Sequence, residues 1–219
     1  MRLAKDGVPV VIHDATLRRT GLRSDEIAQM TSRQLANANV GSWFNRAHPT
    51  LARDDYEQQR VPALADVFQF FRDRRAFIYV ELKTEGTNSS SDLVRAVADA
   101  ILEFGFQQRV FVVSFELPAI AAIKSLHSSI RTGALFASQR RPKVTWRSDS
   151  ILYAASDCGA DELLPHRLLA RPKLIAKAQD RHLPVVVWTV DDQAWVARAK
   201  SLAIHALITN NPARLLAVA

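Results

Sequence analysis

Short apolar runs alternate with longer amphipathic segments along the 219-residue chain. The run at residues 77–82 (FIYVEL) is typical of a strand that is buried on both faces, and the run at residues 110–113 predicts the next strand. The run at residues 184–190 (PVVVWTV) predicts the strongest strand in the chain. Further strands are predicted at residues 9–13, 133–136, 162–164 and 206–209. Strands that alternate with helices usually pair in parallel, so the pattern predicts an α/β protein built from βα units.

Apolar residues spaced three and four apart predict helices between these strands. Thr31 and Gln34 resemble a capping box, and Asp92 and Gly105 are expected to begin and end a longer helix. Residues 45–60 are polar and predict a long loop. No linker interrupts the series, so we expect residues 1–219 to form a single domain.

Composition narrows the class of protein. The chain is 48% hydrophobic and 23% charged, which is ordinary for a globular protein, and its one cysteine, Cys158, excludes an internal disulfide bond. We expect Cys158 to be a small buried residue. No apolar run approaches the ~18 residues of a membrane span, so stable membrane insertion is not predicted. The single cysteine and the lack of a visible signal sequence favour a cytoplasmic location.

The net charge of +7 favours anionic partners. The basic residues are dispersed, however, and the densest group, residues 140–143 with Arg147, lies in a polar stretch that predicts an exposed loop. No recognition module supports nucleic-acid binding, so the charge by itself is a weak guide to function.

Polar residues follow the predicted strands at their carboxyl ends, where active sites of parallel α/β proteins gather. They are His13, Glu81, Lys83, Ser114, Trp188 and Thr209. Each has a structural alternative: a surface histidine, an ion pair between residues 81 and 83, a helix cap at residue 114, or a core indole. Together they favour one polar site. The histidines at positions 166, 182 and 205 lie at irregular places and are expected to be structural or surface residues.

In this order, the strand ends resemble the glycerophosphodiester phosphodiesterase family. The segment KDGVPVVIHDATLRRT at residues 5–20 resembles the family's most specific signature. GSWF (41–44), VPALADV (61–67), VELK (80–83), VSF (113–115), VVWTV (186–190) and LITNNP (207–212) resemble its later landmarks. Asn210 departs from the pattern, because the family commonly has an aspartate there.

The resemblance implies a (β/α)8 TIM barrel of the phospholipase C-like phosphodiesterase type. It also implies a phosphoric diester hydrolase that converts glycerophosphodiesters to sn-glycerol 3-phosphate and an alcohol, with Mg²⁺ or Ca²⁺ as the usual cofactor. By the same resemblance His13 is the catalytic general acid, Glu81 is a metal ligand, and Lys83 and Trp188 contact the substrate. These residue types suit the chemistry, since a phosphodiester needs charge neutralisation and its alkoxide leaving group needs a proton.

Two family motifs, HRG and E-x-D, are not in the sequence. We therefore expect a barrel that lacks the first βα unit and most of strand 2, from an N-terminally truncated family member. One carboxylate should bind Mg²⁺ or Ca²⁺ poorly, so this chain is expected to be inactive or weakly active. The alternatives are a non-catalytic phosphate-binding pseudoenzyme, and a related phospholipase C-like phosphodiesterase or lyase that acts on another phosphodiester.

Overall fold

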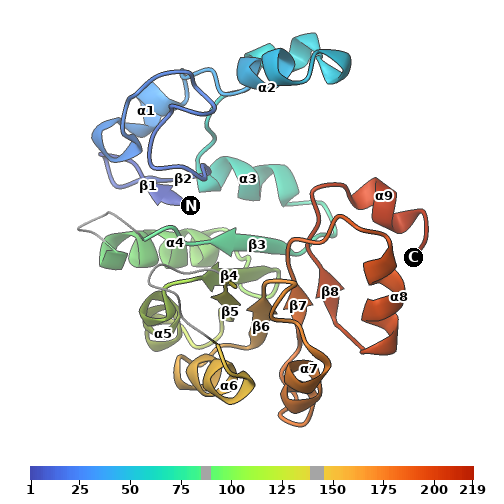
Figure 1. Ribbon diagram of the computed structural model, residues 1–219. Coiled ribbons are helices and arrows are strands. Elements are labelled where there is room, and N and C mark those ends of the chain that lie inside the picture. The colour runs from blue at the N-terminus through green and yellow to red at the C-terminus, as the bar shows by residue number, and fades with distance from the viewer. Residues whose placement is uncertain (85–89, 139–145) are drawn as a thin grey trace. The chain divides into compact units, whose positions relative to one another are not determined.

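The computed structural model describes residues 1–84, 90–138 and 146–219 (Figure 1). These residues form two compact units, Met1–Val110 and Phe111–Ala219. Residues 85–89, which precede the predicted start of a helix at Asp92, and the basic cluster at 140–143 lie outside the described residues.

The second unit has regular βα alternation. Its elements are β4 (Val110–Ser114, which begins at the unit boundary), α5 (Leu117–Leu126), β5 (Arg131–Phe136), α6 (Ser148–Asp157), β6 (Glu162–Pro165), α7 (Pro172–Gln179), β7 (Val186–Val187), α8 (Ala194–Ser201), β8 (Ala206–Leu207) and α9 (Pro212–Leu216). Strand β5 pairs in parallel with both β4 and β6, and β7 pairs in parallel with β8. The predicted α/β class with parallel strands is confirmed.

The region predicted as the strongest strand, residues 184–190, is a strand only at β7. Isolated parallel bridges join Leu163 to Val185 and His166 to Trp188, so the chain follows β6 in the same direction on both sides of β7. Pro184 has no backbone N–H to donate to a ladder, which is one reason the strand begins late.

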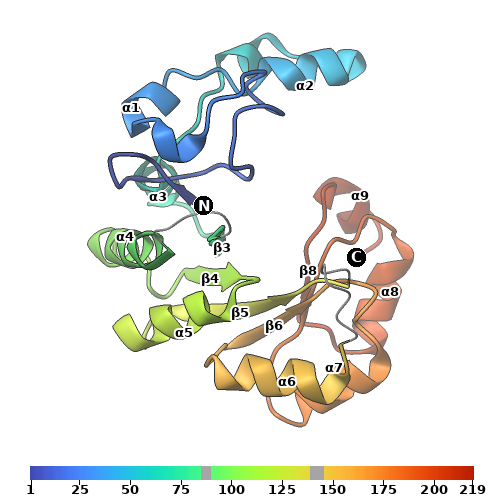
Figure 2. The same cartoon turned by 60° about the vertical axis from the view of Figure 1, so that its left-hand side comes forward.

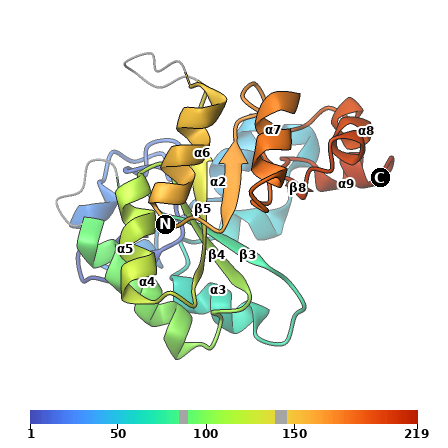
Figure 3. The same ribbon diagram turned by 90° about the horizontal axis from the view of Figure 1, so that it is seen from below.

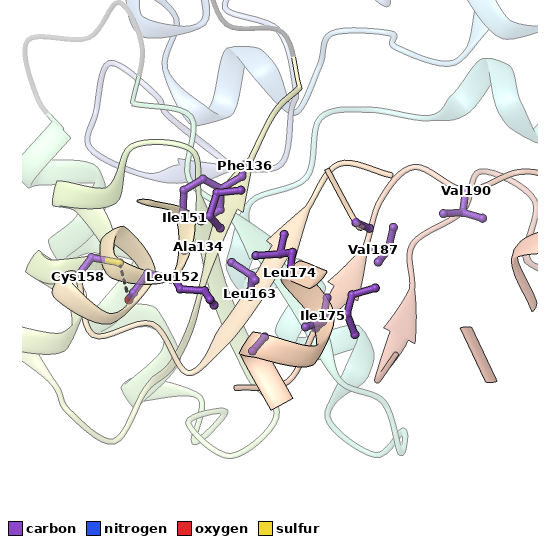
Figure 4. Packing of buried hydrophobic residues seen from close by; sticks show 14 of the residues in the cluster. Ala134, Phe136, Ile151, Leu152, Cys158, Leu163, Leu174, Ile175, Val187 and Val190 are labelled. Carbon is purple, nitrogen blue, oxygen red and sulfur yellow. Dashed lines mark hydrogen bonds between the residues drawn. The ribbon is translucent and has the colours of Figure 1, made fainter. Parts of the chain in front are cut away.

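Helices α5, α6 and α7 lie along one face of strands β4, β5 and β6 (Figures 2 and 3). The buried side chains between these layers form one hydrophobic cluster that includes Phe136, Leu163 and Ile175 (Figure 4). Cys158 lies in the cluster, with its thiol 3.3 Å from the Ala155 carbonyl oxygen. Burial raises the pKa of this thiol. The prediction of a small buried cysteine is confirmed.

The first unit is less regular. Its elements are β1 (Arg2–Leu3), β2 (Pro9–Val10), the 3₁₀ turn η1 (Ile27–Gln29), α1 (Ser32–Leu35), α2 (Ser42–Ala47), the 3₁₀ turns η2 (Pro49–Leu51) and η3 (Asp54–Gln58), α3 (Leu64–Phe71), β3 (Ile78–Glu81) and α4 (Ser90–Glu103). The predicted strand at residues 9–13 is shorter than expected. It forms an antiparallel hairpin with β1 because the chain reverses at Asp6-Gly7, where Gly7 has φ +79°.

The helix ends of this unit agree with the prediction at residues 31–34 and 105 but differ from it at residue 92. Thr31 and Gln34 form the predicted capping box, and Gly105 has φ +70° after α4, as expected of a helix stop. Asp92 is not an N-cap, because α4 begins two residues earlier and Asp92 lies in its first turn. The predicted loop at 45–60 is also partly wrong, since it contains the end of α2 and both η2 and η3.

Buried rings join α3 to the segment after α4. Phe68 is fully buried and stacks on Phe106 with ring centroids 4.6 Å apart. The guanidinium of Arg109 donates to the carbonyl oxygens of Phe71 (2.8 Å) and Arg72 (3.0 Å), which satisfies carbonyls at the end of α3. In the part of the chain that the structure describes, every helix is too short or too polar to cross a bilayer.

Candidate active site

Three of the four predicted site residues line the same cavity in the first unit. His13, Glu81 and Lys83 surround a space of about 290 Å³, together with apolar side chains that include Val11 and Leu64. A cavity of this size that has apolar walls and a few convergent polar groups is typical of a small-molecule site.

Glu81 and Lys83 face one another, as their spacing of two residues along an extended segment predicts. The Lys83 Nζ lies 2.6 Å from the Glu81 Oε1, and the two side chains are 15% and 30% exposed. The backbone there is fixed by Met1, whose nitrogen donates to the Glu81 carbonyl oxygen and whose carbonyl oxygen accepts from the Lys83 N–H at 3.0 Å. This is the bonding pattern of a parallel strand pair.

His13 lies beyond the end of β2 and is held by polar side chains. Its Nδ1 lies 2.7 Å from Asp14 Oδ1, and Asp14 Oδ2 accepts from Arg19 Nε at 2.7 Å. Arg2, which is 9% exposed, donates from Nε to the His13 carbonyl oxygen at 3.0 Å. The Arg19 guanidinium lies over the Trp43 ring at 5.5 Å. The hydrogen bonds from Arg19 and His13 hold the pKa of Asp14 below its usual range.

The fourth residue, Trp188, belongs to the second unit. Its indole N–H donates to the Leu164 carbonyl oxygen at 2.8 Å, which fixes the plane of the ring. Two more rings meet it edge to face: Phe115, with its centroid 5.3 Å away, and His166, with its centroid 5.0 Å away. Each of these rings is only partly buried.

His166 was expected to be structural or at the surface, and its contact with Trp188 is one that sequence reasoning missed. A signal was present, because His166 lies two residues after the predicted strand at residues 162–164, and His13 ends the predicted strand at residues 9–13. The His166 Nδ1 accepts from the Leu168 N–H at 3.3 Å. Burial, with a smaller contribution from Arg167, lowers the pKa of His166.

Ser114 and Thr209, which also lie at strand ends, make hydrogen bonds that hold the loops after their strands. Ser114 is fully buried, and its hydroxyl oxygen accepts from the Glu116 N–H at 3.0 Å just before α5. Thr209 donates to Asp191 at 2.9 Å, and the Asn210 side chain binds the other oxygen of that carboxylate, also at 2.9 Å. These hydrogen bonds, together with the Asn210 N–H, lower the pKa of Asp191. They tie the loop after β7 to the loop after β8.

The fold is that of an α/β protein whose parallel strands correspond to part of a (β/α) barrel, with a polar cavity beside a strand end. The sequence profile of the glycerophosphoryl diester phosphodiesterase family matches residues 1–214, and the chain belongs to that family. It is 24% identical over 216 residues to the glycerophosphodiester phosphodiesterase of Caldanaerobacter subterraneus subsp. tengcongensis, covering 99% of this chain and 82% of that protein.

Solved structures of similar proteins have the same fold. A phosphodiesterase from Oleispira antarctica, in complex with the product sn-glycerol-3-phosphate, superposes with a TM-score of 0.82 at 19% identity. The comparison covers 99% of this chain and 81% of that one. A glycerophosphodiester phosphodiesterase from Agrobacterium tumefaciens gives a TM-score of 0.75 at 22% identity, covering 99% of this chain and 84% of that one.

Proposed function

We propose that the protein is a phosphoric diester hydrolase that cleaves glycerophosphodiesters to sn-glycerol 3-phosphate and an alcohol. The observation that carries this proposal is the meeting of His13, Glu81 and Lys83 around one cavity, in a chain that belongs to a family of such hydrolases. The substrate is a small molecule that carries one negative charge on its phosphodiester.

In this proposal each residue has a defined task. Lys83 neutralises a phosphoryl oxygen, which lets a nucleophile approach the anionic diester. His13 gives the proton on its Nε2 to the departing alkoxide, while the Asp14 carboxylate holds the other ring nitrogen and fixes the orientation of the ring. Trp188 contributes a ring against which the organic part of the substrate packs.

The family generally uses a divalent cation, and we propose Mg²⁺ or Ca²⁺ with Glu81 as one ligand. Either ion takes six or more oxygen ligands. No three His, Cys, Asp or Glu side chains gather to hold an ion within residues 1–84, 90–138 and 146–219. Glu81 is also paired with Lys83. Because the described donors do not fit the ion by themselves, no step of the reaction is assigned to it.

We propose further that residues 1–219 alone hydrolyse the substrate slowly or not at all, since one carboxylate holds a divalent cation weakly. The Glu81–Lys83 pair also supports the alternative of a phosphate-binding protein without catalysis, because an anion attracts Lys83 whether or not a metal is bound. The single-domain organisation and the cytoplasmic location stay predictions.

The test measures release of sn-glycerol 3-phosphate from glycerophosphocholine by the full chain, with Mg²⁺, with Ca²⁺ and with EDTA. We expect slow release that His13→Ala and Glu81→Gln abolish. Ser201→Ala, an exposed change on α8, is the matched control and should leave the rate unchanged. Release that is as fast in His13→Ala as in the wild type would contradict the proposed acid. Phosphate binding with no release would favour the alternative.

A further inference from the structure

The connection between α3 and β3 in the first unit exposes both aromatic and cationic side chains. Residues 70–77 (FFRDRRAF) contain three phenylalanines, three arginines and one acidic residue. Phe70 is 60% exposed and Phe77 is 66% exposed, and the three arginines are exposed as well. Single exposed apolar residues are common, but large ones on one short segment are a mark of interaction surfaces. We call residues 70–77 the 70–77 patch.

Arg109 gives the 70–77 patch a fixed backbone. Its guanidinium donates to four carbonyl oxygens of the connection, those of Phe71 (2.8 Å), Arg72 (3.0 Å), Arg74 and Ala76 (3.3 Å). A connection that is held at four points keeps its shape, so a partner can bind it with little ordering of the backbone. The exposed rings and charges are therefore presented in a preorganised way.

The charges of the 70–77 patch select an anionic partner. Arg72 and Arg75 carry planar guanidinium groups that bind phosphate oxygens in a bidentate manner, and Asp73 is the one acidic residue beside them. An anionic bilayer offers phosphate groups with apolar acyl chains directly beneath them. Aromatic side chains enter such an interface while cationic side chains stay at the level of the headgroups.

Single-stranded nucleic acid also has phosphates, and it binds surfaces that combine arginines with aromatic rings. Its bases stack on ring faces that are open. The Arg74 guanidinium covers one face of the Phe70 ring, 4.3 Å from the centroid, and Phe71 packs against Phe70 at 5.0 Å with the ring planes at 82°. Rings packed in this way stack poorly on bases and still present their edges to hydrocarbon. The geometry therefore favours a lipid surface.

We propose that the 70–77 patch docks the protein reversibly on an anionic lipid surface. The rings of Phe70 and Phe77 enter the interface, and the arginines bind headgroup phosphates. Docking of this kind is peripheral and needs no membrane-spanning helix. It goes beyond the proposed function and does not depend on it.

The test is sedimentation of the full chain with vesicles of phosphatidylglycerol and phosphatidylcholine in equal parts, compared with vesicles of phosphatidylcholine alone. We expect binding to the anionic vesicles only, and weaker binding as the salt concentration rises. Arg72→Gln/Arg75→Gln should weaken binding about 25-fold, or about fivefold for each charge. Arg171→Gln/Lys173→Gln removes two exposed charges at the start of α7 and is the matched control, which should have little effect.

A second pair of variants tests the aromatic part. Phe77→Ala should weaken binding to the anionic vesicles about fivefold, because the ring no longer enters the interface. Tyr153→Ala removes a ring that is 73% exposed on α6 and should leave binding unchanged.

Three results would overturn the inference. The first is no binding to the anionic vesicles. The second is equal weakening by the two charge variants, which would mean that net charge alone attracts the protein. The third is tighter binding to single-stranded oligo(dT) that Arg72→Gln/Arg75→Gln abolishes, which would assign the 70–77 patch to nucleic acid. Because the measurement involves no hydrolysis, none of these results bears on the proposed function.

Discussion

The two units hold their candidate residues by different means. In the second unit the backbone fixes Trp188 and His166, since both lie at strand ends and join in a parallel bridge. In the first unit His13 lies beyond a two-residue strand, and side chains position it: Asp14 on the ring, Arg2 on the carbonyl oxygen. The comparison teaches that a strand end fixes a residue where the pairing continues as far as that residue, as the bridge between His166 and Trp188 does. His13 lies three residues after the end of the paired strand β2, so polar side chains position it.

This difference predicts that mutations in the second unit act mainly on stability, and mutations of the polar partners in the first unit act mainly on chemistry. The largest expected effect is therefore on the core of the second unit. Phe136 is 2% exposed and packs edge to face on Trp146 with ring centroids 5.0 Å apart. Phe136→Ala should lower the free energy of unfolding by about 3–5 kcal/mol, measured by urea denaturation.

Tyr153→Ala is the matched control for that prediction, because it also removes a ring from the second unit. Tyr153 is 73% exposed on α6, so its loss should change the free energy of unfolding by no more than about 0.5 kcal/mol. Equal effects of the two substitutions would contradict the core that the structure assigns to Phe136.

Gly41 in the first unit and Gly133 in the second unit each lie too close to a neighbouring segment to leave room for a Cβ atom. A Cβ on Gly41 would lie 1.7 Å from the Tyr56 carbonyl oxygen, and a Cβ on Gly133 would lie 2.3 Å from a Leu164 methyl carbon. A side chain can rotate away and a backbone carbonyl cannot. We expect Gly41→Ala to cost about 3 kcal/mol of unfolding free energy and Gly133→Ala about 1 kcal/mol, by the same denaturation measurement. The reverse order would contradict this account of the 41–56 contact.

The regular part of the fold could be predicted from the sequence because its signal is local. The predicted strands at 77–82, 110–113 and 133–136 correspond to β3, β4 and β5 with shifts of one or two residues. The predicted loop at 45–60 failed for the opposite reason. Contacts between distant residues shape that segment, such as the edge-to-face pair of Phe44 and Tyr56 at 5.5 Å, and no periodic pattern records them.

The candidate site was predictable to a similar extent. The rule that polar residues at the carboxyl ends of parallel strands gather in one site predicted that His13, Glu81 and Lys83 lie together. The spacing of two residues between Glu81 and Lys83 indicated the ion pair. The rule did not reveal the hydrogen bond from Arg2 to the His13 carbonyl oxygen, because that contact depends on the β1–β2 hairpin. His166 was missed because a histidine that follows a strand looks the same in sequence whether its ring faces solvent or an indole.

Substitution of the polar partners of His13 should lower the rate of hydrolysis and leave the free energy of unfolding almost unchanged. Asp14→Asn keeps the shape of the side chain and loses its charge, so the His13 ring should be held less well. We expect about a tenfold lower kcat/KM for glycerophosphocholine, whose alkoxide leaving group needs a proton. A glycerophosphodiester with p-nitrophenol as the leaving group needs no proton, and its hydrolysis should be almost unaffected. Equal losses for both substrates would mean that Asp14 has only a structural role.

The smallest expected effect is the dependence of stability on the charge of Asp14. Its pKa is lowered in the folded protein, so its contribution is present above the unfolded pKa of about 3.9 and is lost as the pH falls through the folded pKa. The partners are largely exposed, which limits the contribution to about 1 kcal/mol or less. The difference in unfolding free energy between wild type and Asp14→Asn should therefore be small at pH 6 and should approach zero toward pH 2.5. A difference that grew as the pH fell would contradict the hydrogen bonds that Asp14 accepts from Arg19 and His13, and with them the view that side chains hold His13 in this unit.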